Sequence, residues 1–360
     1  EGYDRIVVLH STPGITILDQ LSGCYQGKYV LDYRDVSHEN FGFYRRLILK
    51  LSQNAGLVLA SSPSYLKYLR NAGGVYLKHN LLKTPYEHRG EGAYRCSDTP
   101  IRVRYWGMIR HEHANRAMID ALGGDSRFEL HYNGREEEVA IRLKRHVAQC
   151  GYGNVFFHGP YYPDERARFA SETDIVHNVY ENDFATVGAM GNKYYDALQF
   201  RLPQICTEGS IMGDEIEAKG LGLAVDYESE FLADAIANYF TGIDLVEFSA
   251  SCADELASVL GYRPSHFPGR ARPHTLHCLL SDFGQEGTGL SSRPLSVLVL
   301  LRFNRIECCR GFCLPILLHG RIRYVGIQVG VLWRSDSHSK KEIFLVVGKV
   351  HLSCRRNCCG

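Results

Sequence analysis

Short apolar runs alternate along this chain with longer amphipathic stretches, which is the pattern of an α/β protein. The clearest case lies at 174–226. There an apolar run at Ile175–Tyr180 ends in a polar loop, a helix begins at Asn192 and is stopped by Pro203, and another apolar run follows at Gln204–Cys206. Strand, loop, helix and strand in this order form the repeating unit of a parallel sheet.

The same alternation continues on both sides of this stretch. Further strands are predicted at Ile6–Ser11 (entering a loop), Lys28–Asp35, Leu57–Ser62, Val75–Asn80, Ile101–Trp106 and Phe128–Gly134, and a strand with the loop after it at Asn154–Tyr162. Helices are predicted at about 41–54, 63–69, 114–122, 136–149, 163–172, 229–239 and 245–260. The polar, glycine-containing residues 86–99 have the composition of a linker. We therefore predict one domain at 1–95 and a second at 96–262.

The character of the chain changes from about residue 263. Residues 264–360 hold 14 Lys and Arg against 5 Asp and Glu, whereas the preceding residues hold 27 against 35. The tail has poor periodicity, although VLVLL, YVGIQVGVLW and IFLVVGKV suggest short strands. Seven of the 12 cysteines lie in the tail, at positions 278, 308, 309, 313, 354, 358 and 359.

Three interpretations of the tail are open. The groups Cys308–Cys313 and Cys354–Cys359 could form a zinc module, although their spacing is unusual for one. The excess of positive charge could instead indicate an appendage that contacts anionic lipid or nucleic acid. The third interpretation, which we favour, is that this irregular stretch, rich in Arg, Cys, Ser and Leu, is translated in the wrong frame and is not native sequence. We therefore predict no function for it.

The bulk composition is that of an ordinary globular protein. Apolar residues make up 45% of the 360 residues and charged residues 22%, and the net charge is +1, which implies no nucleic-acid partner for the chain as a whole. No apolar run approaches the roughly 20 residues that span a membrane. Cysteines outside the tail are scattered singly, as in cytoplasmic proteins.

The opening of the predicted helix at 192 carries the best candidate chemistry. Asn192 and Asp196 are four positions apart, and Lys193 and Asp196 three, so they share a face near the positive helix end. Unpaired N–H groups there suit an anion such as a diphosphate, and Lys193 adds a full charge. The spacing alone fits equally an N-capped surface helix with a local Lys–Asp pair.

A second candidate is the loop after the strand at 101–106. Gly107 lets the backbone approach a phosphate, and Arg110 can bind a phosphate through two parallel hydrogen bonds. His111 and His113 flank this loop, but no third ligand lies in register, so we predict no metal site.

Polar residues also follow the strands of the first domain. Arg34, Asp35 and Glu39 are candidate acceptor-side groups, because ligands bind at the carboxyl ends of parallel strands. The alternative is a solvated strand end with these charges paired locally. His10, at another strand end, is a candidate proton acceptor or sugar contact, or simply a residue that caps a loop.

These motifs together resemble those of one enzyme family. NKYYDAL followed by Pro203, and then EAKGLGLAVD, is similar to the donor-binding core of GT-B glycosyltransferases. The group 4 and group 1 types of capsular and exopolysaccharide synthesis, with the pattern N-K-x-Y-E-A-L-x-x-x-x-P, are the most similar. DYRD, SS and KHN in the first domain recur there in the same order. The resemblance covers about residues 1–262.

The resemblance implies a fold and roles for individual residues. It implies two Rossmann-like domains, the amino-terminal one truncated by about 60 to 80 residues. It also implies that Asp196, in place of Glu, holds the ribose, that Arg110 contacts the diphosphate, and that Tyr180 and the loop around Gly188 face the sugar. Gly188 stands where the family has a second Glu.

The function expected from this resemblance is sugar transfer from a UDP- or GDP-linked donor to a carbohydrate or lipid-linked acceptor, with retention of anomeric configuration. No resident cofactor is expected, and the implied location is cytoplasmic, peripheral at the inner face of the membrane. Two alternatives stay open at this point. A nucleotide-sugar epimerase uses the same fold, and a non-catalytic binding or scaffold protein would lack turnover.

Overall fold

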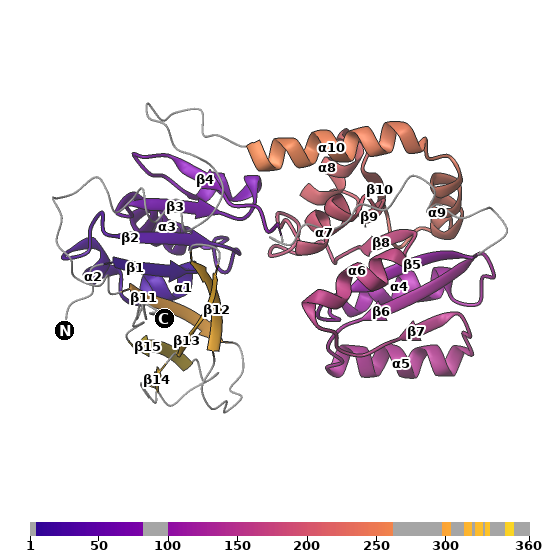
Figure 1. Ribbon diagram of the computed structural model, residues 1–360, viewed down its shortest axis with the longest axis horizontal. Helices are drawn as coiled ribbons and strands as arrows, with labels where there is room; N and C mark the ends of the chain where they lie inside the picture. The colour runs from indigo at the N-terminus through magenta and orange to yellow at the C-terminus, as the bar shows by residue number, and fades with distance from the viewer. Residues whose placement is uncertain are drawn as a thin grey trace, which may run out of the picture. The chain divides into compact units, whose positions relative to one another are not determined.

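The computed structural model describes residues 5–81 and 100–261, together with the backbone of five strands between 297 and 348. The chain divides into two compact units, one formed by 1–78 with 263–360 and the other by 79–262. Each unit contains a sheet with helices against it (Figure 1), and the sheet is parallel throughout in the second unit and mixed in the first. The fold is therefore α/β, as the sequence predicts.

The second unit is built on a six-stranded parallel sheet in the order β10-β9-β8-β5-β6-β7. Its strands are β5 (Ile101–Trp106), β6 (Phe128–Asn133), β7 (Val155–Phe157), β8 (Ile175–Asn178), β9 (Gln204–Thr207) and β10 (Gly222–Val225). Most of their residues are buried, which explains why they read as short continuous apolar runs rather than alternating ones.

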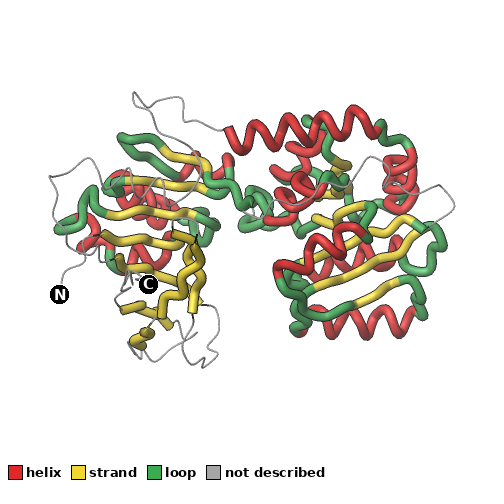
Figure 2. The backbone as a smooth tube through the Cα atoms, viewed as in Figure 1, coloured by secondary structure: helices red, strands yellow, loops and turns green. Residues whose placement is uncertain are grey.

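Helices alternate with these strands along the chain (Figure 2). They are α4 (Glu112–Leu122), α5 (Glu138–Cys150), α6 (Arg166–Ser171), α7 (Asn192–Phe200), α8 (Ile211–Ala218), α9 (Leu232–Thr241) and α10 (Leu245–Gly261). A 3₁₀ turn at Pro163–Glu165 precedes α6, where the sequence predicts one continuous helix.

Two layers of helix cover the sheet of the second unit. One hydrophobic cluster joins the sheet to α4, α5 and α9, and another joins the opposite face to α6 and α7. Helix α5 shows the reason, because its buried residues Ala140, Leu143 and Val147 recur at helical spacing and form one apolar stripe.

The first unit has a sheet of its own, whose first four strands are parallel. Strands β1 (Arg5–Leu9), β2 (Tyr29–Tyr33), β3 (Leu57–Ala60) and β4 (Val75–Leu77) pair in chain order. Helix α3 (Gly42–Gln53) lies between β2 and β3, and the predicted helix at 63–69 is a 3₁₀ helix, Pro63–Tyr68.

The loop predicted after the first strand contains two short helices instead, α1 (Ser11–Thr16) and α2 (Leu18–Ser22). Gly14 in α1 lies so close to the core that a β-carbon would be 2.7 Å from Leu51. Such a close approach depends on a residue of α3, distant in the sequence, so the local pattern does not reveal it.

The backbone of the tail adds strands to the first unit. They are β11 (Val297–Phe303), β12 (Cys313–Leu318), β13 (Arg321–Gly326), β14 (Gln328–Val331) and β15 (Ile343–Gly348). Strand β11 pairs parallel to β1, and β15 pairs antiparallel to β11. Apart from the backbone of Cys313, the cysteine groups of the zinc interpretation lie outside the described residues, as does the predicted linker at 86–99.

Among the described residues, no helix combines the length and the apolar character needed to cross a membrane. The predicted boundaries of the domains at 95 and 262 stay predictions.

Candidate functional site

The candidate site lies at the carboxyl end of the second unit's sheet, between β5 and β8. The chain leaves β5 toward β6 on one side, whereas β8 pairs with β5 on the other side. Loops that leave adjacent strands in opposite directions open a crevice, and open α/β sheets bind ligands at such a point. The loops after β5 and β8 and the first turn of α7 all begin at this edge.

The loop after β5 is held by close backbone packing. Gly107 has φ 121°, a conformation that a side chain would strain, and a β-carbon added to Gly134 would lie 1.7 Å from the Gly107 carbonyl oxygen. The hydroxyl of Tyr105 donates to the carbonyl oxygen of Met108 at 2.6 Å. Arg110, at the end of this loop, is exposed. The backbone of the loop is thus fixed, while the guanidinium of Arg110 remains accessible to solvent.

Lys193, in the first turn of α7, is the central charged group of the site. Only 4% of the residue is exposed. Its ammonium nitrogen lies 3.8 Å from the centre of the Tyr105 ring and 4.6 Å from the centre of the Tyr180 ring. It donates a hydrogen bond of 3.1 Å to the Tyr180 hydroxyl. Burial, with a further contribution from the charge of Arg110, lowers the pKa of Lys193 to about 7.

Tyr180 closes this group of side chains on its other face. Its ring stacks on the ring of His111 at 4.7 Å between centroids, with 22° between the planes. His111 caps the start of α4 in the left-handed conformation. Burial and the charges of Arg110 and Lys193 lower the pKa of His111 to about 4, so this imidazole is neutral at pH 7. Glu181, the next residue, accepts a hydrogen bond of 2.8 Å from the His113 backbone N–H.

The carboxylate of Asp196 is engaged by two side chains of the protein. Trp106 Nε1 donates to Asp196 Oδ2 at 2.8 Å, and Arg166 contributes an ion pair at 3.3 Å. Asp196 is 1% exposed, and burial raises the pKa of its carboxyl group. The expected local pair with Lys193 is therefore replaced by a pair with Arg166, because α6 and β5 face this side of α7. A ribose contact at Asp196 would require these partners to rearrange.

The remaining predicted donor-side residues lie around the same helix end. Asn192 is exposed at the first position of α7, so it does not share the buried environment of Asp196. Gly188 is half-buried in the loop between β8 and α7. Gly191, the residue before the helix, lies so close to Tyr180 that a β-carbon would be 2.8 Å from its hydroxyl oxygen. The structure thus brings Gly107, Arg110, Tyr180 and Lys193 to one edge of the sheet.

The acceptor-side candidates lie in the first unit. Arg34 pairs with Asp32 at 2.8 Å, and Asp32 pairs at the same distance with Lys78, so local pairing accounts for part of this charge. Asp35 is exposed. Glu39 is 1% exposed and accepts a hydrogen bond of 2.5 Å from the Tyr33 hydroxyl, so its carboxylate is part of the interior.

His10 has φ 86° and caps the start of α1. Its Nδ1 accepts from the Thr12 backbone N–H at 3.4 Å, and its Nε2 lies 3.3 Å from Ser37 Oγ. The structure therefore bears out the capping alternative for the ring, and it leaves a role in proton transfer as a prediction.

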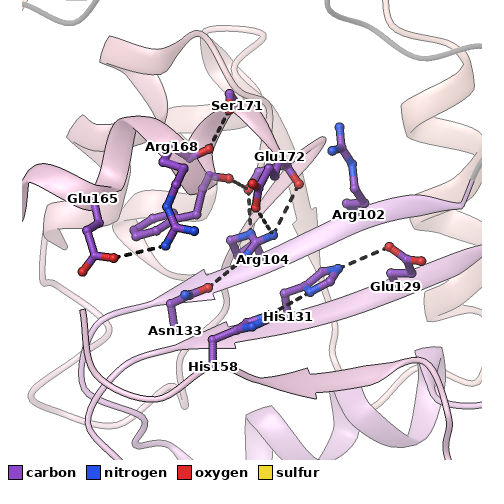
Figure 3. Close-up of polar contacts among 12 residues, drawn as sticks. Arg102, Arg104, Glu129, His131, Asn133, His158, Glu165, Arg168, Ser171 and Glu172 are labelled. Atoms are coloured by element: carbon purple, nitrogen blue, oxygen red, sulfur yellow. Dashed lines mark hydrogen bonds and ion pairs between the residues drawn. The ribbon is translucent and has the colours of Figure 1, made fainter. Parts of the chain in front are cut away.

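Sequence reasoning missed a buried polar cluster on the α6 side of the sheet (Figure 3). Arg104, 3% exposed, donates to Thr173 Oγ1 at 3.0 Å and to Asn133 Oδ1 at 2.8 Å. Next to it His131 Nδ1 and His158 Nε2 lie 3.0 Å apart. Arginine at alternate positions of β5, Arg102 and Arg104, is the only signal that the sequence offers for this cluster.

Comparison with known proteins places this geometry in a known fold. No family model and no curated protein sequence matches the chain. A sucrose-phosphate synthase from Thermosynechococcus elongatus matches in structure with a TM-score of 0.54 at 14% identity, over 71% of this chain and 69% of that one. A glycosyltransferase from Rickettsia africae matches with a TM-score of 0.52 at 15% identity, over 70% of this chain and 72% of that one. The fold is GT-B. At these identities the likeness establishes the architecture of the GT-B chain, and its activity has to be argued from its own site.

Proposed function

We propose that this GT-B chain is a glycosyltransferase, which moves a sugar from a nucleotide-sugar donor to a carbohydrate or lipid-linked acceptor in polysaccharide synthesis. The observation that carries the proposal is the buried ammonium of Lys193 at the amino-terminal turn of α7, with Arg110 nearby and no carboxylate bonded to it among the described residues. A buried cation without a bound carboxylate is costly unless an anion binds it. A nucleoside diphosphate is the anion that fits a helix end flanked by two cations.

The two cations would act on the leaving group. In sugar transfer the bond between the anomeric carbon and the diphosphate oxygen breaks, and negative charge builds on that oxygen. Lys193 and Arg110 would stabilise this charge in the transition state, where such interactions contribute most to the rate. The donor is a substrate, linked to UDP or GDP, and the proposal includes no resident cofactor.

Other residues would orient the two substrates. Tyr180, Asn192 and the loops around Gly107 and Gly188 would contact the donor. Asp196 would bind the ribose if Arg166 moved aside. If Arg166 stays in place, Asp196 would instead hold the side chains of Trp106 and Arg166 in position. In the first unit, Arg34 and Asp35 would contact the acceptor, and the buried Glu39, bonded to Tyr33, would hold the loop that follows them. His10 would take the proton of the acceptor's attacking hydroxyl. A location at the cytoplasmic face of a membrane belongs to the same proposal. So does transfer with retention, in which the acceptor attacks on the face that the diphosphate leaves and the proton taken by His10 passes on to the departing diphosphate oxygen.

The proposal is tested by product analysis with the full chain. UDP- and GDP-linked sugars are incubated with and without carbohydrate and lipid-linked acceptors, and released nucleotide and sugar products are measured. Nucleotide release that depends on the acceptor and is lost in Lys193→Met, but kept in Lys50→Met on the exposed face of α3, supports the proposal. An isomerised nucleotide sugar formed without acceptor would point instead to an epimerase. Binding without turnover would point to a scaffold.

A further inference from the structure

Three side chains with metal-ligating atoms meet on the outer surface of the second unit, away from the cluster at Lys193. Asp120 belongs to α4, and His146 and Cys150 belong to α5. Each can offer one ligand atom, and these three atoms lie within 4.8 Å of one another. His146 and Cys150 are four positions apart, so they project from one face of α5 toward the neighbouring helix.

The distances are close to those of a metal site. The sulfur of Cys150 lies 3.8 Å from Nδ1 and 3.9 Å from Nε2 of His146, and Nε2 contacts Asp120 Oδ1. In a tetrahedral zinc site, bonds of about 2.3 Å to sulfur and about 2.0 Å to nitrogen put these two ligands about 3.5 Å apart. A shift of a few tenths of an ångström, within the reach of an exposed cysteine, would bring the sulfur to this distance. The exposed Asp120 carboxylate, which now contacts Nε2 directly, would have to draw back to admit the ion.

The surroundings favour a cation at this position. Cys150 is the last residue of α5, where the helix dipole presents its negative end. Gly151, in the left-handed conformation, ends the helix and donates its N–H to the carbonyl oxygen of Val147. The His146 side chain is only 12% exposed and packs against the ring of Tyr152, so its position is fixed before a ligand arrives.

Arg116 competes most directly with such a cation. Arg116 Nη2 lies 3.2 Å from His146 Nδ1, and Arg116 Nε lies 3.9 Å from Asp120 Oδ2. The guanidinium takes part of the place that a metal would fill, and it is about half exposed, so it can turn away into solvent. Arg116 and His146 also line a surface pocket together with Arg142 and Arg145, whose positive charges disfavour the approach of a cation through it.

We propose that Asp120, His146 and Cys150 form a site for zinc or a similar borderline-soft divalent metal, with water in the fourth position. Thiolate, imidazole and carboxylate together select such a metal over Mg²⁺ and Ca²⁺, which prefer oxygen ligands alone. Binding releases the proton of the Cys150 thiol to solvent, and the metal then links α4 to α5. This proposal does not depend on the proposed sugar transfer.

The test is residue-resolved alkylation of the full chain under reducing conditions. Iodoacetamide reacts with free thiolate, so a metal-bound thiolate is protected. Peptide mapping by mass spectrometry follows Cys150 with and without excess Zn²⁺. Cys24, which is also exposed, serves as control in the same sample. We expect zinc to slow alkylation of Cys150 by at least ~10-fold and to leave Cys24 unchanged.

Variants separate a three-ligand site from a reactive surface thiol. His146→Gln and Asp120→Asn should each raise the zinc concentration that half-protects Cys150 by at least ~10-fold. Removing even a group that is hydrogen-bonded to a metal ligand lowers metal affinity by this much, and a ligand itself should matter at least as much. His38→Gln, which replaces an exposed histidine of the first unit, should leave this zinc concentration unchanged. Arg116→Ala should lower it, because the competing guanidinium is gone. A Cys150 rate that does not respond to zinc, or protection that survives either ligand substitution, overturns the site.

Discussion

The ammonium of Lys193 lies 3.8 Å from the centre of the Tyr105 ring, so a charge at the start of α7 is held against the end of β5. Tyr180 covers the ammonium from the end of β8. Three elements of the sheet edge thus converge on one cation. Attraction to two aromatic rings offsets part of the cost of burying it, and an anion would offset the rest.

This relationship predicts that the buried ammonium of Lys193 lowers the stability of the folded chain. Its pKa falls from 10.5 to about 7 in the folded chain, so between these values the unfolded state binds more protons and stability rises with pH. We expect Lys193→Met to be more stable than the wild type by ~1–3 kcal/mol at pH 6, with the difference shrinking toward pH 10. Urea unfolding at several pH values measures it. Lys50→Met, on an exposed site, should leave the profile unchanged, and a destabilised Lys193→Met at pH 6 would contradict this account.

Gly134 should be needed for the loop that carries Arg110. A β-carbon at this position would lie 1.7 Å from the Gly107 carbonyl oxygen, so Gly134→Ala must displace the loop. We expect a loss of ~1–3 kcal/mol in stability and weaker nucleotide binding. Gly153→Ala is the matched control, because a β-carbon there meets nothing within 4 Å. Equal behaviour of the two variants in thermal unfolding and in nucleotide titration would show that the loop tolerates the change.

Arg104 should be structural, with little direct effect on nucleotide binding. Its guanidinium is almost fully buried and donates to Thr173. It also donates to Asn133 (Figure 3). Arg104→Met leaves buried polar partners unsatisfied, so we expect a loss of ~3–5 kcal/mol in chemical unfolding. Arg168→Gln removes a guanidinium that is 67% exposed from the same cluster, and it should cost less than ~1 kcal/mol. Comparable losses in both variants would contradict the burial argument.

Acid should destabilise the second unit through its neutral histidines. Burial and the charge of Arg104 lower the pKa of His131 to about 3, and burial lowers that of His111 to about 4. Below pH 6.5 these imidazoles bind protons in the unfolded chain but not in the folded chain. The free energy of unfolding therefore falls as the pH falls toward 4. Each histidine contributes a slope of up to ~1.4 kcal/mol per pH unit. His131→Gln should reduce the slope of the unfolding free energy against pH between pH 4 and 6.

The sequence predicts the frame of the site well, because that frame is local. The strand at 101–106 has the predicted bounds, and the stretch around Asn192 folds as the predicted strand, loop, helix and strand. Gly107 permits the turn after its strand, and Pro203 stops its helix, and both effects follow from the residue type alone.

The partners of the charged residues could not be predicted in the same way. Spacing suggests that Asp196 pairs with Lys193, yet its partners are Trp106 and Arg166, which only the packed sheet brings to α7. Likewise the group of Asp120, His146 and Cys150 combines two helices, and only the i, i+4 spacing of its last two members is visible in the sequence.

The most direct test of the central claim is calorimetric titration of UDP and GDP into the full chain, Lys193→Met and Lys50→Met. We predict that at least one nucleotide binds the wild type and Lys50→Met, and that Lys193→Met loses at least ~100-fold in affinity, about 2.7 kcal/mol. Wild-type binding at pH 8 should take up a proton, seen as a dependence of the heat on buffer ionisation, because the diphosphate raises the lowered pKa of Lys193. Unchanged affinity in Lys193→Met, or no binding to a folded wild type, would contradict the assignment of a nucleotide diphosphate to this helix.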